Sequence, residues 1–236
     1  MKAVRIHEDG GPEVLRYEEA PDPSPGPGEV LLSLRAASLN HLDVWLRRGL
    51  PSVPKPRILG ADGAGVVASL GEGVRGVEVG DAVVLNPGLD DGKHIVGEHM
   101  DGTHAELIAV PAEYVHPLPD GMSFEEAAAF PLVFATAYRM LATRAKVREG
   151  EWVLVWGIGA GVATASLAIA KALGARVLAT STSDEKLVRA KELGADEVVR
   201  TDEDVVAAAR ELTDGAGVDI VVEHVGEATW KSSLQA

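Results

Sequence analysis

The clearest pattern of hydrophobic and polar positions along the chain lies in residues 152–186. The apolar run VLVW (residues 153–156) leads into a glycine-rich turn, and an apolar stretch follows from Val162 to Leu173. The short β-rich run predicts a strand, and the longer stretch predicts a helix that ends at Gly174. A second apolar run, RVLAT (residues 176–180), predicts another strand. This strand–turn–helix–strand order is that of one half of a doubly wound parallel sheet, the arrangement that binds mononucleotides.

Strand and helix patterns keep alternating after this unit. We expect helices at residues 184–193 and 203–212, and strands at residues 197–199 and 218–223. A further helix begins in the final segment WKSSLQA. A sheet that stopped at its fourth strand would leave an exposed edge and an uncovered apolar face, whereas doubly wound sheets usually have about six strands. Either the sequence belongs to a longer chain, which we favour, or a partner completes the sheet.

The first 120 residues show a different pattern, in which short apolar runs partly alternate with polar residues between glycine and proline clusters. These runs predict strands at residues 1–6, 14–19, 30–39, 63–71, 81–86 and 104–110. Ser123 and Glu126 form a capping box that predicts a short helix, and a longer apolar helix follows at residues 131–145. The expected organisation is a β-rich domain (1–122), linking helices (123–150) and a doubly wound domain (151–236).

Composition narrows the classes of function. The chain has 236 residues, enough for one or two domains. It contains no uncharged apolar run of the ~18 residues that suggest a membrane span and no apolar signal core at its start, so we expect a cytoplasmic protein without a membrane partner. A formal net charge of −14 argues against nucleic-acid and anionic-membrane partners, and we expect a small-molecule substrate. The absence of cysteine excludes disulfides, thiolate nucleophiles and cysteine-ligated metals.

The glycine-rich turn is the first candidate for chemistry. Free backbone N–H groups at a helix N-terminus, with the helix dipole behind them, favour a pyrophosphate. Glycines let the chain turn tightly and approach that ligand without a Cβ in the way. Ala160 and Ala163 stand where the usual GxGxxG spacing could place a glycine. We interpret the turn as a dinucleotide site rather than a tight turn without a ligand. The residues expected to contact the dinucleotide there are Gly157, Gly159, Ala160, Gly161 and Val162.

Four further segments carry a resemblance to a known family. They are SLNHLDVWLRRG (38–49), ILGADGAGVVASLGEGVRGVEVGDAVV (58–84), GEHMDGTHAELIAVP (97–111) and EEAAAFPLVFATAYRML (125–141). Together with the glycine turn, they resemble the medium-chain dehydrogenase/reductase superfamily over essentially the whole chain. The resemblance implies an α/β protein with an N-terminal β-rich GroES-like domain and a Rossmann doubly wound parallel sheet, truncated here after its fourth strand. Relatives often pair through their last strand, so it also implies a homo-oligomer, dimer or tetramer, for a full-length chain.

Several positions separate this chain from the zinc-containing members of that superfamily. Asn40 and Leu132 stand at or near cysteine ligands of those members, and Ala61 stands at a histidine ligand. A catalytic zinc needs three protein ligands, so the resemblance implies a chain without it. The segment DDGKHIV (90–96) replaces a four-cysteine lobe, so no structural zinc is expected. Leu42 replaces a proton-relay hydroxyl. These departures place the resemblance in the zinc-free quinone oxidoreductase and enoyl reductase branch.

Histidines near residue 100 offer an alternative metal site. His94, Glu98, His99 and His104 lie close in sequence, and imidazole–carboxylate sets bind zinc. The spacings 94–99 and 99–104 match no pair of helical ligands, and the segment has a loop-like composition. We therefore expect a polar rim to the substrate cleft here rather than a metal.

The expected cofactor is NADP(H), with NAD(H) as the alternative. NAD-binding units usually carry an acidic residue about twenty residues past the glycines, where it binds the ribose 2′-hydroxyl. Ser181 stands at that point and does not repel a 2′-phosphate, while Lys186 and Arg200 offer positive charge. Ser181 and Lys186 are similar to the pattern of NADP-preferring members. The alternative for Lys186 is an ordinary solvated lysine that pairs with Asp184 or Glu185.

Without a metal, the expected reaction is hydride transfer from NADPH to a quinone or an α,β-unsaturated carbonyl. Such acceptors delocalise the arriving charge onto an oxygen, so a hydrogen-bond donor suffices. Asn40 lies in the catalytic region of the family and is the first candidate donor, with a turn-capping asparagine as the alternative. Asp43 is a second catalytic candidate, although it is architectural in most members, and Thr136 matches a threonine that packs on the nicotinamide. The rival functions are a zinc alcohol dehydrogenase with rebuilt ligands and a nucleotide-binding relative without catalysis.

The remaining candidate residues each have two interpretations. His41 matches a position that contacts the pyrophosphate in relatives, or it is a surface residue at a helix start. Asp62 takes the place of the glutamate of a zinc site, or it only holds its loop. Trp45 anchors an amphipathic helix or walls the substrate pocket. His224 and Val225 should flank the cofactor ribose, because doubly wound sheets bind ligands at strand C-termini; strand-end packing is the alternative for His224.

Overall fold

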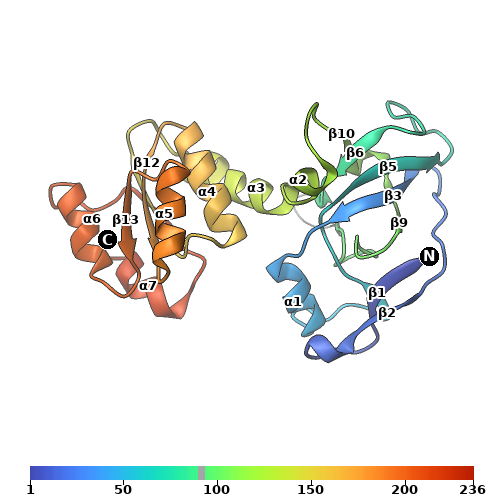
Figure 1. Cartoon of the computed structure of the whole chain (residues 1–236), viewed down its shortest axis with the longest axis horizontal. Coiled ribbons are helices and arrows are strands. Elements are labelled where there is room, and N and C mark those ends of the chain that lie inside the picture. The colour runs from blue at the N-terminus through green and yellow to red at the C-terminus, as the bar shows by residue number, and fades with distance from the viewer. Residues whose placement is uncertain (90–93) are drawn as a thin grey trace. The chain divides into compact units, whose positions relative to one another are not determined.

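The computed structural model describes residues 1–89 and 94–236, and the chain forms two compact units (Figure 1). Unit 1 comprises Met1–Leu132, and unit 2 comprises Val133–Ala236. Among the described residues, none of the helices has both the length and the apolar character that crossing a bilayer requires.

An antiparallel five-stranded sheet forms the centre of unit 1. In spatial order its strands are β10 (Val115–Pro117), β6 (Ala82–Leu85), β5 (Gly63–Leu70), β3 (Glu29–Ala37) and β9 (Leu107–Pro111). Side chains alternate across a strand, so Val30 and Leu32 of β3 enter the core, where they meet Val67 of β5. Two smaller sheets accompany it, β2 (Leu15–Glu19) with β1 (Lys2–Ile6) and β4 (Arg57–Ile58), and β7 (Gly88–Leu89) with β8 (His94–Ile95).

The described part of unit 1 includes two short α-helices, α1 (His41–Arg47) and α2 (Phe124–Ala128). The predicted capping box of α2 is confirmed. The Glu126 amide donates to Ser123 Oγ at 3.2 Å, and the Ser123 amide donates to Glu126 Oε2 at 2.9 Å. Such reciprocal bonds satisfy two of the free N–H groups at a helix start. Helix α1 follows β3 after a short turn and brings two candidate residues, Asn40 and Asp43, to its first turn.

Unit 2 contains a four-stranded parallel sheet. Its strands, in spatial order, are β13 (Glu197–Arg200), β12 (Arg176–Ser181), β11 (Trp152–Val155) and β14 (Ile220–Val222). Parallel neighbours need crossover connections. The helices that follow the strands are α4 (Gly161–Ala172), α5 (Asp184–Glu192), α6 (Val205–Leu212) and α7 (Glu227–Ser233). The GroES-like β-rich domain and the Rossmann parallel sheet predicted from the sequence are confirmed.

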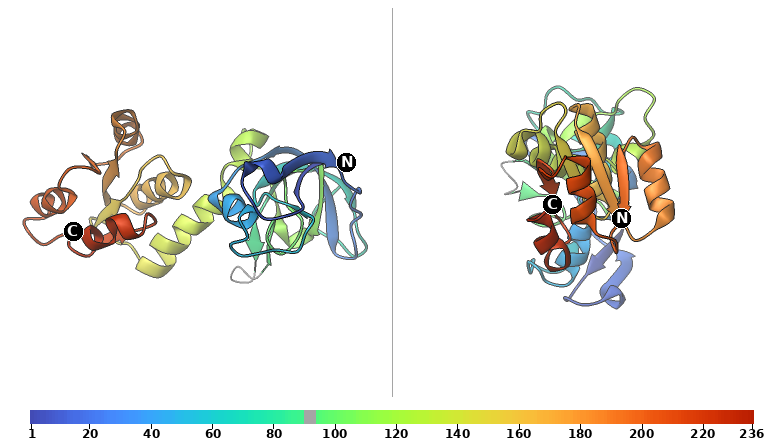
Figure 2. Two further views of the ribbon diagram at one scale, coloured as in Figure 1. Left: turned by 90° about the horizontal axis from the view of Figure 1, so that it is seen from below. Right: turned by 90° about the vertical axis from the view of Figure 1, so that its left-hand side faces the viewer.

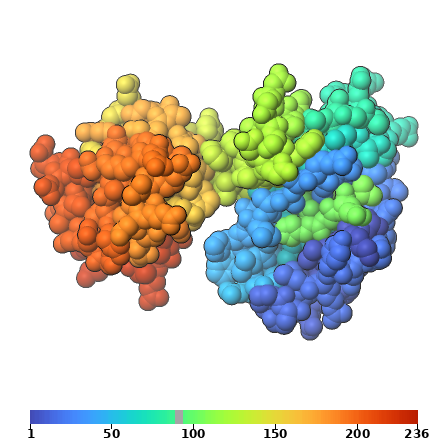
Figure 3. Space-filling model, viewed as in Figure 1, coloured from blue at the N-terminus to red at the C-terminus, as the bar shows by residue number. Residues whose placement is uncertain are grey.

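Helices cover both faces of this sheet (Figure 2). On one face, Val153 of β11 packs with Leu167 of α4 and Leu187 of α5. On the other face, Leu154 packs with Val205 of α6. In the space-filling view of Figure 3, unit 2 is seen from the side of α5, which appears in orange. A strand buried on both faces reads as a continuous apolar run, and this explains the VLVW pattern.

The predicted helix at residues 131–145 is helical throughout, but its geometry changes partway. It begins as α3 (Pro131–Tyr138) and continues as a π-helix over Arg139–Ala145. Lys146 ends it in the left-handed conformation, with a φ of 56°. A π-helical segment of this kind has no signature in apolar periodicity, because wider turns change the spacing only locally.

Most of the predicted strands agree with the structure to within three residues. The strand predicted at residues 218–223 is shorter, because the Val218 amide donates to the carbonyl of Ala236 at 2.9 Å and so does not join the ladder with β11. Strands β4, β7, β8 and β10 were not predicted. They are two or three residues long, which is too short to show an alternating pattern.

Candidate functional site

The glycine turn of unit 2 follows β11 directly. Gly157 and Gly159 adopt φ values of 60° and 99°, in a region of backbone conformation that residues other than glycine rarely adopt. Thr180, in β12, holds the turn from beside it. The Gly157 amide donates to Thr180 Oγ1 at 3.2 Å, and the Ile158 amide donates to the Thr180 carbonyl at 2.7 Å. The turn is therefore supported by the neighbouring strand.

Helix α4 begins at the end of this turn without a side-chain cap. Within the described residues, the amides of Gly161 and Val162 make no hydrogen bond, as expected for the first turn of a helix. These N–H groups, together with the dipole of the twelve-residue helix, suit an anion. A Cβ on Gly161 would lie 2.8 Å from Cγ1 of Val133, so glycine also allows α3 to approach α4 closely.

Lys186 lies over the glycine turn. A Cβ on Gly159 would lie 2.7 Å from Cδ and 3.1 Å from Cε of Lys186. Neither acidic neighbour suggested by the sequence binds it: among the described residues, the Lys186 ammonium makes no hydrogen bond or ion pair. Ser183 caps the N-terminus of α5: its Oγ accepts from the Lys186 amide at 3.4 Å, and this cap fixes the start of the helix that carries the lysine. A cation is thus placed beside the turn.

The end of β12 carries no carboxylate. Ser181 is buried, and its Oγ accepts from the Ser183 amide at 3.2 Å. The nearest acidic side chain in sequence, Asp184, is an ion-pair partner of Arg200, with Oδ1 to Nη1 at 2.5 Å. Arg200 also donates to both carboxylate oxygens of Asp202, at 2.9 and 3.0 Å. These hydrogen bonds raise the pKa of the Arg200 guanidinium above its usual range. Arg200 is therefore already balanced by two acids, unlike Lys186.

The end of β14 meets the glycine turn as expected for a strand C-terminus. His224 Nε2 lies 2.8 Å from the carbonyl oxygen of Trp156, the residue before Gly157. A Cβ on Gly157 would lie 3.6 Å from His224 Cε1 and 3.8 Å from Val225 Cγ2. His224 and Val225 therefore flank the turn. Thr136 is exposed on α3, one helical turn after Val133.

In unit 1 the candidate residues form a hydrogen-bonded group around Asp62. Asn40 Nδ2 donates to Asp62 Oδ2 at 2.9 Å, and Ser38 Oγ lies 3.2 Å from the same oxygen. The Leu132 amide donates to Asp62 Oδ1 at 2.9 Å. The acceptor at Asp62 also assigns the amide orientation of Asn40. Within the part of the chain that the structure describes, the second N–H of Asn40 makes no hydrogen bond, so it is available to a ligand.

Asp43 acts within the backbone of unit 1. Its Oδ2 accepts from the Asn40 amide at 2.7 Å, and its Oδ1 accepts from the Gly60 amide at 3.0 Å. The side chain is buried, and both of its oxygens are used. This arrangement matches the architectural alternative for Asp43, and it holds Asn40 close to the loop that carries Asp62. His41 is exposed on α1, and Trp45 is 46% exposed.

Asp62 is the most buried carboxylate of this group, with 1% of its surface exposed. Burial raises the pKa of Asp62, although the hydrogen bonds from Asn40, Leu132 and Ser38 each oppose that shift. A zinc ion would need at least three ligands here. The amide N–H groups of Asn40 and Leu132 are donors, which repel a cation, and the Ala61 side chain has no ligand atom. The residues around Asp62 therefore do not fit a zinc ion.

The histidine segment shows no metal cluster among its described residues. Among the described residues, no three histidine, aspartate or glutamate side chains gather closely enough to hold a metal. His99 Nδ1 accepts from the Ile95 amide at 3.0 Å, and His104 Nε2 lies 3.2 Å from the Ser38 carbonyl oxygen. Part of the segment expected to replace a zinc lobe, residues 90–93, lies outside the described residues.

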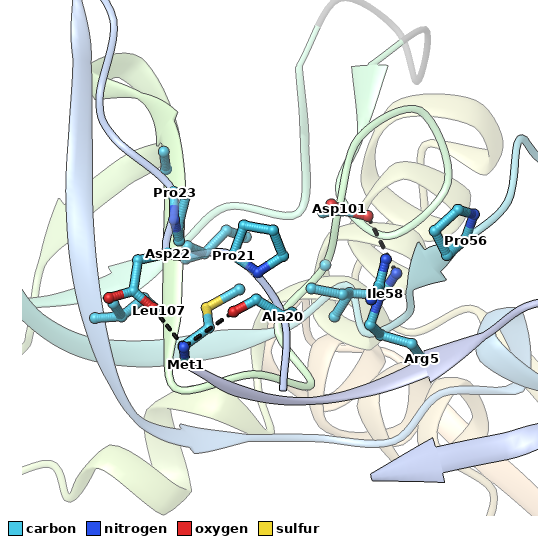
Figure 4. A pocket seen from close by; sticks show the side chains of 13 residues that line it. Met1, Arg5, Ala20, Pro21, Asp22, Pro23, Pro56, Ile58, Asp101 and Leu107 are labelled. Atoms are coloured by element: carbon cyan, nitrogen blue, oxygen red, sulfur yellow. Dashed lines mark hydrogen bonds and ion pairs between the residues drawn. The ribbon is translucent and has the colours of Figure 1, made fainter. Parts of the chain in front are cut away.

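Unit 1 also contains a cavity of about 490 Å³, shown in Figure 4. Polar groups that line this cavity already make hydrogen bonds within the protein. The N-terminal amine binds the Ala20 carbonyl at 3.0 Å, and Asp101 accepts from the Ile58 amide at 3.1 Å. None of the candidate site residues lines it.

Two residues with a role in the turn were not predicted. Thr180 was overlooked because its effect depends on the register of β11 and β12, although a hydroxyl near the end of the second strand is a usable signal. Glu223 directly follows β14 and accepts hydrogen bonds from two amides of the turn that carries His224. An acidic residue followed three positions later by glycine could have indicated it.

Comparison with known proteins agrees with this arrangement. Residues 26–120 match a family model described as alcohol dehydrogenase GroES-like domain, and residues 161–236 match one described as zinc-binding dehydrogenase. A quinone oxidoreductase of Pseudomonas aeruginosa is 36% identical over 99% of this chain and 69% of its own length.

Solved structures show the same fold. One described as an NAD-dependent alcohol dehydrogenase is 47% identical, with a TM-score of 0.96 over 100% of this chain and 74% of its own. The Escherichia coli quinone oxidoreductase complexed with NADPH is 31% identical, with a TM-score of 0.89 over 100% of this chain and 69% of its own. The chain therefore belongs to the medium-chain dehydrogenase/reductase superfamily, in its quinone oxidoreductase-like branch, and is an NAD(P)H-dependent oxidoreductase.

Proposed function

We propose that this protein is a zinc-independent oxidoreductase that uses NADPH to reduce a quinone or an α,β-unsaturated carbonyl. The observation that carries the cofactor assignment is the position of Lys186, whose side chain covers Gly159 while its ammonium has no partner among the described residues. A 2′-phosphate supplies the negative charge that such a cation attracts. The NADPH complex of a relative with the same fold supports the assignment.

The other candidate residues of unit 2 each suit a different part of the dinucleotide. The amides of Gly161 and Val162 and the α4 dipole suit its pyrophosphate. Ser181 leaves room for a 2′-phosphate, because it brings no charge that would repel one. Asp184 is neutralised by Arg200, so its repulsion of a phosphate is weakened. When bound, the cofactor supplies the hydride.

For the acceptor, unit 1 offers Asn40. Asp62 fixes one N–H of the Asn40 amide and leaves the other available to donate to a substrate oxygen. One neutral donor suits an acceptor whose conjugation spreads the arriving charge, as in a quinone or an enone. Reduction of a simple ketone needs stronger polarisation of the C–O bond, which a metal would provide. The donor set around Asp62 therefore favours a conjugated acceptor and a reaction without zinc.

Direct binding and turnover measurements test this proposal. NADPH and NADH are titrated against the purified protein, and a quinone, an enone and a primary alcohol are assayed with the matching cofactor. We expect tighter binding of NADPH, turnover of the quinone or the enone, and no zinc by metal analysis. Binding of NADPH without turnover of either acceptor would support the non-catalytic alternative.

The relative described as an NAD-dependent alcohol dehydrogenase supports a second candidate function, the NAD-dependent oxidation of an alcohol. Oxidation of the alcohol with NAD, together with stoichiometric zinc that is lost with activity, would establish that function and overturn the proposal.

A further inference from the structure

The turn between β14 and α7 is organised around one carboxylate, that of Glu223. Its Oε1 accepts from the amides of Val225 and Gly226, at 2.8 and 2.9 Å. Both of its oxygens also lie within 3.0 Å of Thr229 Oγ1, and its Oε2 accepts from Ser233 Oγ at 2.5 Å. Burial alone would raise the pKa of Glu223, but the hydrogen bonds from Ser233, Gly226 and Thr229 outweigh it and lower the pKa. The side chain is therefore an anion at neutral pH.

Ser233 connects this carboxylate to the glycine turn. The indole N–H of Trp156 donates to Ser233 Oγ at 2.8 Å, and the Ser233 hydroxyl in turn donates to Glu223. Trp156 is 2% exposed and immediately precedes Gly157. A continuous chain of hydrogen bonds therefore runs from Trp156, just before the glycine turn, through Ser233 of α7 to Glu223, just after β14.

The same tryptophan is held at its backbone. The carbonyl oxygen of Trp156 lies 2.8 Å from His224 Nε2, and His224 belongs to the turn that Glu223 closes. Donation from Nε2 assigns the proton to that nitrogen in the neutral ring. Trp156 is thus held through its side chain by Ser233, which bonds Glu223, and through its carbonyl by His224, which follows Glu223 in the chain.

We propose that Glu223 is a positioning residue for the dinucleotide site, and that it acts through Ser233 and Trp156 to set the glycine turn. The role rests on the proposed function, because it concerns the cofactor assigned there. The Glu223 carboxylate accepts from amides of its own turn and from hydroxyls of α7, and these donors stabilise its charge. It holds Gly157 and His224 in place without contact with the ligand.

The substitution Ser233→Ala separates this role from the folding of the β14–α7 turn. It removes the link to Trp156 and leaves the bonds from Glu223 to Val225, Gly226 and Thr229 intact. We expect the Kd for NADPH to rise about fivefold to tenfold, the effect of one hydrogen bond, with kcat at saturating NADPH unchanged. Ser232→Ala is the matched control, because it removes the adjacent hydroxyl, which makes no hydrogen bond among the described residues, and it should bind as the wild type does.

A spectroscopic measurement reports the link itself. With ¹⁵N-labelled tryptophan, the indole N–H resonance of Trp156, assigned with Trp156→Phe, should move in Ser233→Ala and stay in place in Ser232→Ala. The conservative variant Ser233→Thr keeps a hydroxyl and should restore both the resonance and the Kd.

The outcomes separate the two proposals. A wild-type protein that does not bind NADPH would overturn the proposed function and this role together. A wild-type protein that binds NADPH, with a Ser233→Ala variant that binds it equally well although its indole resonance has moved, would overturn the positioning role alone. An indole resonance that does not move would contradict the hydrogen bond on which the role depends.

Discussion

The side chain of Lys186 lies across the backbone of Gly159, so closely that a Cβ on Gly159 would approach Lys186 Cδ to 2.7 Å. The two residues come from different elements, the turn after β11 and the helix α5. Glycine therefore does two things at position 159. It allows a φ of 99°, and it leaves the space through which the lysine reaches the turn.

Replacing this glycine should weaken cofactor binding. In Gly159→Ala, the new methyl group displaces Lys186. The positive φ at this position also costs a residue other than glycine about 1 kcal/mol. We expect the Kd for NADPH, measured by titration, to rise at least tenfold. Gly215→Ala is the control, because Gly215 also has a positive φ, 89°, but open space around it. Equal effects of the two substitutions on the Kd would show that backbone strain, and not the lysine, is responsible.

The charge of Lys186 should decide between the two cofactors. In Lys186→Met the stem over Gly159 is kept while the ammonium is lost. We expect the KM for NADPH to rise about tenfold and the KM for NADH to stay within a factor of two, since a charge-assisted bond to phosphate contributes about 1.5 kcal/mol or more. Arg189→Met, on the same helix and paired with Glu192, should change neither. A parallel loss for both cofactors would contradict a contact with the 2′-phosphate.

Asn40 should affect the chemical step more than cofactor binding. In Asn40→Ala the free N–H disappears, and we expect kcat with the best acceptor to fall on the order of a hundredfold, as when an oxyanion donor is removed. The Kd for NADPH should not change. Leu39→Ala, which trims an exposed neighbouring side chain, should leave kcat close to that of the wild type. An unchanged kcat in Asn40→Ala would leave only the turn-capping role.

The Lys171–Asp196 ion pair should make the free energy of unfolding depend on pH in the acidic range. Asp196 Oδ2 accepts from Lys171 Nζ and from the Val177 amide, each at 2.7 Å. Burial alone would raise the pKa of Asp196, but these bonds outweigh it and lower the pKa below the ordinary aspartate value of 3.8. An acid whose pKa is lower in the folded state stabilises the fold above its unfolded pKa. That contribution is lost as the pH falls from 3.8 through the folded pKa.

Denaturant unfolding at several pH values measures this contribution. Asp196→Asn should lower the free energy of unfolding by about 1 kcal/mol at neutral pH, a modest value because the pair is about a third exposed. The difference from the wild type should shrink in acid. Glu192→Gln, which breaks an exposed pair, should cost no more than about 0.5 kcal/mol. A difference for Asp196→Asn that does not change with pH would contradict the argument.

The parts of the fold with long apolar patterns were predictable. Residues 153–156 are buried on both faces of a parallel sheet, and their uninterrupted apolar run shows it. The capping box at Ser123 was predictable because all its partners lie within four residues. The short strands β4 and β7 were not, since two residues carry no periodicity.

Site residues were predictable where their role follows from residue type and local sequence. They were less predictable where their role depends on hydrogen bonds to residues distant in sequence. The glycines of the turn and Ser181 follow from local sequence. The bond between Asn40 and Asp62 joins residues that are 22 positions apart, and it depends on how β5 pairs with β3. The sequence suggested Asp184 and Glu185 as alternative partners for Lys186. Only the structure shows that Asp184 binds Arg200 instead.

Thr180 has a consequence for how this protein meets a ligand. One residue of β12 accepts hydrogen bonds from two successive amides of the turn, so the protein's own contacts support the shape of this loop. A loop supported in this way should lose little backbone freedom when a ligand binds, so ordering it should cost little affinity. Discrimination between dinucleotides must then come from the side chains that surround the turn. Exchanging those side chains is a practical way to change coenzyme preference without rebuilding the fold.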